Sequence, residues 1–152
     1  MSETRRGTLR LHLLIVEDGP GDFRLLQLAM EKNGFNAELH GVSDALAAMQ
    51  FLHRQGEAYR HAPRPDLILL DLRLPEQDGL AFLTLLKNDP AWHAIPVVII
   101  SASEHETDVS AAYQRGAAGY VVKPVDLNEF VLAIHRLGQY WFNLVRLPER
   151  ID

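Results

Sequence analysis

The chain has 152 residues, of which 47% are hydrophobic and 23% charged, so it has the size and composition of one globular domain. Its formal net charge of −5 argues against direct DNA binding, and no apolar run approaches the roughly 18 residues of a membrane span. The absence of cysteine excludes disulfides and thiolate chemistry, and no histidines are spaced as metal ligands on one predicted helix face. Because no signal peptide is recognisable, we expect a cytoplasmic protein.

Short apolar runs alternate with segments of helical period along the chain, which is typical of βα units around a parallel sheet. The predicted strands are Leu11 to Val16, Asn36 to Val42, Asp66 to Leu70, Pro96 to Ile100 and Gly119 to Val122. Right-handed crossovers leave few strand orders for such a chain. We therefore expect a flavodoxin-like (βα)5 doubly wound α/β sheet, with five parallel strands in the order 2-1-3-4-5.

The helices between these strands carry recognisable end signals. Pro20 fits the first turn of the first helix, and Gly34 fits its C-terminal end. Ser43 and Asp126 are candidate N-caps of the second and last helices, and Gly116 ends the fourth. Residues 54–65 form the one long connection, which we expect to be a surface loop of unassigned role.

Polar side chains follow four of the apolar runs at the points where the predicted strands end. These side chains are Glu17 and Asp18, Asp71, Ser101 and Lys123. A single such residue is usually a cap or a turn residue, but the carboxyl ends of parallel strands converge, so we expect this set to form one site. Like-charged carboxylates about 4 Å apart repel by on the order of 4 kcal/mol per pair at an effective dielectric of 20. One lysine cannot offset three carboxylates, so we expect Mg²⁺ there, with Asp71 placed as a nucleophile for phosphoryl transfer.

Four segments, VEDGPGD, LLDLRLPEQDG, VIISAS and GYVVKPVDLNEF, closely resemble the receiver domain of two-component response regulators, and the resemblance runs from Leu11 to Arg136. It implies that the protein accepts a phosphoryl group from a sensor histidine kinase and changes the face formed by helix 4, strand 5 and helix 5. The implied site has a phosphoacceptor, Mg²⁺ ligands that include a backbone carbonyl, a phosphate-contacting lysine before a cis proline, and a switch pair. The phosphoacceptor is Asp71, and the Mg²⁺ ligands are Glu17, Asp18, Asp71 and the backbone carbonyl of Arg73. Lys123, which precedes Pro124, contacts the phosphate, and Ser101 with Tyr120 forms the switch pair. The alternative is a degenerate receiver that acts as a constitutive interaction module.

Further segments resemble the stand-alone regulators of phytochrome-type histidine kinases: FLHRQGE, APRPDLILLDL, HAIPVVII and the WF-LV-LP tail. The kinase that this resemblance implies is a bacteriophytochrome. A small phosphatase of similar fold is disfavoured because it usually needs a second aspartate at the position of Arg73. A flavodoxin-like binder is disfavoured because the loop after the first strand carries acids that repel phosphate.

Apolar residues continue at spacings of three and four beyond the receiver-like region. This seam is predicted as a homodimer interface and consists of Phe130, Ile134, Leu137, Trp141, Phe142 and Leu144. The alternative is that the tail folds back onto its own domain. The expected organisation is an N-terminal extension over 1–10, a receiver domain over 11–138 and a C-terminal dimerisation tail over 139–152.

Overall fold

The structure, a computed structural model, describes residues 10–74 and 78–149, so most of the expected N-terminal extension lies outside the described residues. Within these ranges, five parallel strands form one sheet in the order β2-β1-β3-β4-β5, which confirms the predicted topology. The strands are β1 (Leu11–Val16), β2 (Ala37–Val42), β3 (Leu67–Leu70), β4 (Val97–Ser101) and β5 (Gly119–Val122). Each predicted strand end lies within one residue of the observed one.

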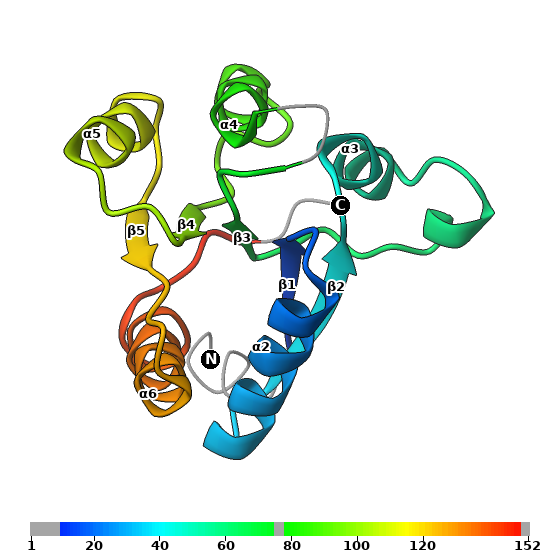
Figure 1. The fold of residues 1–152 in the computed structure, drawn as a ribbon. Helices are drawn as coiled ribbons and strands as arrows, with labels where there is room; N and C mark the ends of the chain where they lie inside the picture. Colours follow the sequence, from blue (N-terminus) through cyan, green and yellow to red (C-terminus); the bar gives the residue numbers. More distant parts are fainter. Residues whose placement is uncertain (1–9, 75–77, 150–152) are drawn as a thin grey trace.

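Helices cover both faces of the sheet (Figure 1). The helices α2 (Pro20–Asn33) and α6 (Leu127–Gly138) lie on one face; α3 (Ala45–His53), α4 (Gly79–Asn88) and α5 (Glu106–Gln114) lie on the other. Each face therefore has its own core, and side chains of β1 alternate between the two: Leu13 and Ile15 pack toward α2 and α6, while Leu14 and Val16 pack toward the other three helices. The site at the strand ends thus stands on a sheet that is packed on both sides.

The helix ends follow the sequence signals with one correction. Pro20 begins α2, Gly34 ends it in the left-handed conformation, and the Asp126 carboxylate caps α6. The N-cap of α3 is Asp44 and not Ser43, because the helix begins one residue later than predicted and the Asp44 carboxylate then accepts a hydrogen bond from the Ala47 amide at 2.7 Å.

The predicted dimer seam is wrong for its first three residues. Phe130, Ile134 and Leu137 are only 7%, 1% and 7% exposed, because α6 turns them into the core that it shares with α2. A surface formed by these side chains is therefore excluded in the folded chain. The apolar periodicity of α6 reflects the packing of this helix on its own sheet.

The tail also differs from the predicted dimerisation element. After α6 the chain forms a π-helical segment, η2 (Gln139–Leu144), whose Trp141 and Phe142 are partly buried against the same core. The Phe142 ring meets Phe35 edge-on at 5.2 Å, and Pro148 and Glu149 line a small cavity beside the residues that precede β3 and β4. The fold-back alternative is therefore correct for most of the tail, and Leu144 is the member of the seam that stays exposed, at 74%.

No helix in the part of the chain that the structure describes is long and apolar enough to cross a membrane.

Candidate functional site

The site is organised around the ammonium group of Lys123, directly after β5. Its Nζ donates hydrogen bonds to Glu17 Oε2 at 2.6 Å, Asp71 Oδ2 at 2.9 Å and Asp22 Oδ2 at 3.0 Å. The Lys123 amide extends the β4–β5 ladder by donating to the Ser101 carbonyl, which fixes where the long side chain begins. The peptide bond between Lys123 and Pro124 is trans, so the expected cis bond is not present. The structure thus brings together ends of β1, β3 and β5, as predicted from the sequence.

Asp22 is a member of this cluster that the sequence analysis missed. It lies in the first turn of α2, where a carboxylate is also favoured by the helix dipole, so by itself its position signals nothing more than a helix start. In the structure, α2 is packed so that this first turn faces Lys123.

Asp71 follows β3 and is held on both of its carboxylate oxygens. Its amide donates to the Val16 carbonyl, Oδ1 accepts from the Arg73 amide at 2.9 Å, and Oδ2 accepts from Lys123. The start of α4 packs directly on this turn, because a Cβ on Gly79 would lie only 2.6 Å from the Asp71 carbonyl oxygen. The aspartate is therefore fixed in one orientation by backbone contacts from two sides.

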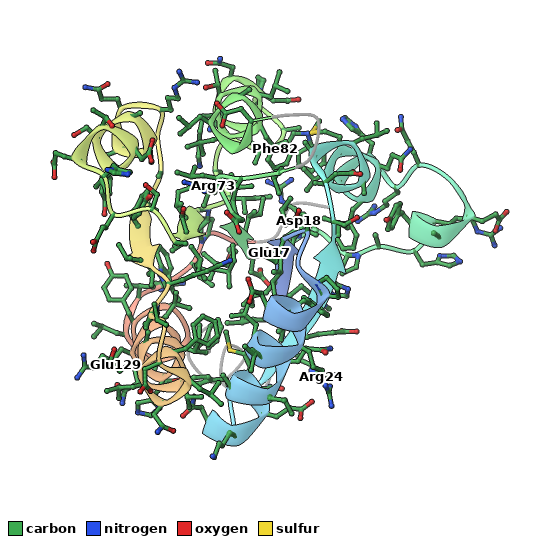
Figure 2. All side chains as sticks on the ribbon, in the orientation of Figure 1. Glu17, Asp18, Arg24, Arg73, Phe82 and Glu129 are labelled. Carbon is green, nitrogen blue, oxygen red and sulfur yellow. The ribbon has the colours of Figure 1, made fainter. Side chains whose placement is uncertain are left out.

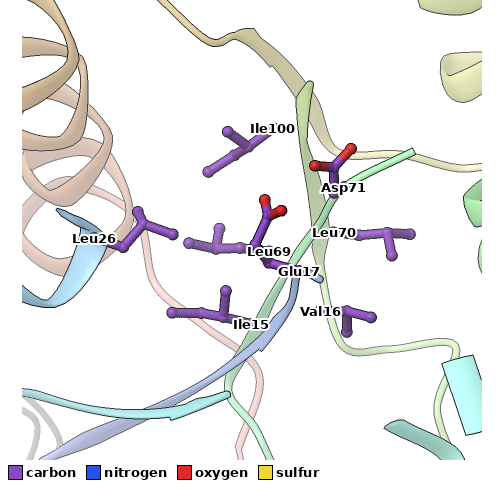
Figure 3. Close-up of a pocket in the computed structure, with 8 residues that line it drawn as sticks. All are labelled: Ile15, Val16, Glu17, Leu26, Leu69, Leu70, Asp71 and Ile100. Carbon is purple, nitrogen blue, oxygen red and sulfur yellow. The ribbon is translucent and has the colours of Figure 1, made fainter. Parts of the chain in front are cut away.

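Glu17 is turned inward and its titration is strongly affected by its surroundings. Figure 3 shows its carboxylate near that of Asp71, with apolar side chains on several sides; these belong to Ile15, Val16, Leu26, Leu69, Leu70 and Ile100. Burial raises the pKa of Glu17 to about 7; the Asp71 carboxylate adds to this rise and the hydrogen bond from Lys123 opposes it. Burial alone would lower the pKa of Lys123, but its bonds to Glu17 and Asp71 outweigh burial and raise it.

The donor set fits a divalent cation. With all groups ionised, the three carboxylates on Lys123 leave an excess of two negative charges at a half-buried place. Asp18 is exposed beside Glu17 and makes no hydrogen bond or ion pair with the other described residues, so its oxygens are available (Figure 2). Carboxylate oxygens are the ligands that hard cations such as Mg²⁺ prefer. Arg73, whose carbonyl is a predicted ligand, lies in the loop after β3, and that role stays a prediction.

The predicted switch pair is connected through a residue that the sequence analysis missed. Ser101 is fully buried at the end of β4, and its Oγ accepts a hydrogen bond from the Ser103 amide at 3.1 Å. The hydroxyl of Tyr120 donates to the Ser103 carbonyl at 2.8 Å, and the Ser103 hydroxyl donates to Asp108 in α5. Ser103 therefore ties the site to both β5 and α5. A serine two residues past a strand end gives no distinctive sequence signal.

Known proteins resemble this chain over most of its length. The family model of the response regulator receiver domain matches residues 13–135. Response regulator Rcp1 of Synechocystis sp. is 40% identical over 136 residues, which cover 90% of this chain and 92% of Rcp1. The crystal structure of Rcp1 in its Mn²⁺-bound form superposes with a TM-score of 0.85 at 39% identity, covering 91% of this chain and 99% of Rcp1.

Two further solved structures are similar over nearly the same length. The phosphorylated cyanobacterial phytochrome response regulator RcpA has a TM-score of 0.86 at 35% identity, covering 93% of this chain and 100% of RcpA. The bacteriophytochrome response regulator RtBRR has a TM-score of 0.71 at 37% identity, covering 92% of this chain and 85% of RtBRR.

Proposed function

This chain belongs to the response regulator receiver family, which serves phosphorylation-based two-component signalling, and we propose that it accepts a phosphoryl group from a sensor histidine kinase onto Asp71. The observation that carries the proposal is the position of Lys123, whose ammonium bridges Asp71 and Glu17 at 2.9 and 2.6 Å. A degenerate interaction module is disfavoured, because such a module has no need to hold an ammonium among three carboxylates, two of which are buried.

The transfer step needs no proton to be removed from the nucleophile. Each oxygen of Asp71 accepts one hydrogen bond, from Arg73 or Lys123, and so keeps a lone pair. One oxygen attacks the phosphorus, the bond from phosphorus to the histidine nitrogen breaks, and the electron pair leaves with that nitrogen. The product is a mixed anhydride on Asp71, and Lys123 neutralises charge that develops on the phosphoryl oxygens.

We assign the metal of this site as Mg²⁺, held by Glu17, Asp18, Asp71 and the backbone carbonyl of Arg73. When bound it supplies positive charge to the phosphoryl oxygens. The support for this assignment is the set of hard oxygen donors and the excess of negative charge around Lys123. Hydrolysis of the phosphoform by water at the same site is the slow self-dephosphorylation that completes the cycle.

The proposed switch runs from Ser101 to the face made by α5, β5 and α6. A phosphoryl oxygen on Asp71 accepts a hydrogen bond from the Ser101 hydroxyl, and turning that hydroxyl toward Asp71 weakens the bond that its Oγ now accepts from the Ser103 amide. Because Ser103 also holds Tyr120 and Asp108, a movement of its loop changes contacts of β5 and α5 together. Phosphorylation then acts as a population shift between two arrangements of this face.

The proposed partners are a kinase and a second copy of the chain. A bacteriophytochrome kinase is proposed from the similarity to RcpA and RtBRR. A homodimer is proposed through the exposed apolar residues at the ends of α6 and on the tail, Leu127, Tyr140 and Leu144, in place of the buried seam. We propose no contact with DNA and a cytoplasmic location. Sedimentation at micromolar concentration that shows monomer with and without phosphorylation would contradict the dimer.

The test of phosphoacceptance uses acetyl phosphate and Mg²⁺ with detection by intact mass. We expect one phosphoryl adduct on the native chain and none on Asp71→Asn. The matched control is Asp126→Asn, which keeps the N-cap oxygen of α6 and should be phosphorylated like the native chain. Absence of an adduct on the native chain, or an adduct that survives in Asp71→Asn, would overturn the assignment.

A further inference from the structure

A second cluster of metal-ligating side chains lies on β1 and β2, away from the phosphoacceptor. It consists of His12, Glu38 and His40. His12 is paired in register with Glu38, and His40 follows two residues later, so all three side chains lie on one face of the sheet. His12 precedes Glu17 by five positions on an extended strand, which separates the two sites by roughly 16 Å.

The ligand atoms have the separations of a small coordination sphere. His12 Nδ1 lies 3.2 Å from His40 Nε2 and 3.4 Å from Glu38 Oε2, and all three atoms lie within 4.8 Å of one another. Zinc bonds of about 2.0–2.2 Å to nitrogen and oxygen at tetrahedral angles place ligand atoms roughly 3.3–3.6 Å apart. The two measured edges agree with this value, so a cation could bind with little rearrangement.

The chemistry of the three groups suits a borderline cation better than Mg²⁺. Two imidazole nitrogens and one carboxylate suit Zn²⁺ and similar divalent transition-metal ions, whereas Mg²⁺ prefers oxygen ligands alone. The side chains of His12 and Glu38 are 19% and 45% exposed, which leaves an entry path.

Neighbouring groups hold the two histidines in place. The His12 amide donates to Asp66 Oδ2 at 2.9 Å, and the His40 ring packs against Phe51 with ring centroids 5.3 Å apart. Contacts of this kind around a metal site fix the orientation of its ligands.

We propose that His12, Glu38 and His40 form a binding site for Zn²⁺ or another divalent cation of the same borderline class, with water in the remaining position. The bound cation clamps the edge strand β2 to β1 toward the amino-terminal ends of these strands. The competing explanation is a hydrogen bond between the two imidazoles, which the same 3.2 Å distance permits without any metal.

The test is a calorimetric titration of the full chain with Zn²⁺ in the presence of excess Mg²⁺, which occupies the acidic site. We expect one Zn²⁺ per chain, a melting temperature that rises with Zn²⁺ concentration, and the same binding by Asp71→Asn. His12→Gln and His40→Gln should weaken binding by at least about tenfold. His93→Gln, which removes an exposed histidine elsewhere, is the matched control and should bind like the native chain.

A measurement on the native chain alone guards against variants that fail to fold. Addition of Zn²⁺ should shift the imidazole ring signals of His12 and His40 in NMR spectra and leave those of His93 unchanged. The proposal is overturned by the absence of Zn²⁺ binding in excess Mg²⁺, by equal binding in His12→Gln and His40→Gln, or by ring signals that do not move. None of these outcomes bears on phosphorylation of Asp71, so the two proposals fail separately.

Discussion

The two ends of β1 carry polar clusters of very different character. At the carboxyl end, Glu17 shares the ammonium of Lys123 with Asp71 and Asp22, and the cluster has more negative charge than it can neutralise. Toward the amino end, His12 meets a second imidazole, and the cluster holds a single carboxylate, that of Glu38. One strand thus presents hard oxygen ligands at one end and borderline nitrogen ligands at the other. Charge excess, and not the mere presence of ligands, makes the carboxyl end depend on its cations.

The largest effect is expected from removing the ammonium group of Lys123 from the carboxyl-end cluster. Lys123→Gln leaves Glu17 and Asp71 buried without their partner, so the free energy of unfolding should fall by about 3 kcal/mol or more, and phosphorylation of Asp71 should be severely slowed. Urea denaturation with and without Mg²⁺ measures this, and Mg²⁺ should restore part of the loss. Lys32→Gln, in the last turn of α2, is the control. If Lys123→Gln and the native chain have equal free energies of unfolding, the excess negative charge does not affect stability.

The second prediction concerns pH. The pKa of Glu17 in the folded chain, about 7, lies above its ordinary value of 4.5, so the folded state binds this proton more tightly than the unfolded state. Its contribution to stability is therefore complete below pH 4.5 and is lost as the pH rises through 7, with a slope of at most about 1.4 kcal/mol per pH unit.

Denaturation without metal at a series of pH values checks this expectation. Glu17→Gln, which cannot ionise, should flatten the pH dependence between pH 4.5 and 7. A native chain whose stability does not decline over this range would refute the raised pKa.

A smaller effect is expected from the close packing of α4 against the Asp71 turn. Gly79→Ala places a methyl group against backbone atoms of Asp71 and Leu72, so the chain should lose about 1–3 kcal/mol of stability and phosphorylate more slowly. Gly21→Ala in α2 is the matched control, because its Cβ meets nothing within 4 Å and alanine favours the helix. If both variants phosphorylate at the native rate, the turn does not depend on this contact.

The smallest effect is expected at the switch. Tyr120→Phe removes the hydroxyl that donates to the Ser103 carbonyl, at an expected loss of about 1 kcal/mol in stability. The variant should still be phosphorylated on Asp71, while the difference between the α5 amide spectra of the two phosphorylation states becomes smaller. Tyr113→Phe, on an exposed tyrosine of α5, serves as control and should leave this difference unchanged.

Glu17, Asp71 and Lys123 were identified because each directly follows an apolar run, and the end of a run marks the end of a strand. Asp22, Ser103 and the group His12, Glu38 and His40 were missed, because nothing in their local sequence distinguishes a contact across elements from an ordinary cap, loop or strand residue.

The tail departs from its prediction for a related reason. The spacing of Phe130, Ile134 and Leu137 marks an apolar helix face but does not say what covers it. In the folded chain that face is covered by its own core, and Gly138 allows the Phe35 ring to approach α6 closely, since a Cβ at this position would lie only 2.0 Å from the ring.

The strand order and the groups that follow the strands can be inferred from the sequence alone, because alternation of buried runs and helices is a local property and right-handed crossovers leave little freedom. Packing between distant elements sets which carboxylates share Lys123, which residue joins Ser101 to Tyr120, and which way the tail turns. These depend on side chains from distant segments meeting at distances of a few ångströms, and such distances are set by packing and not by periodicity.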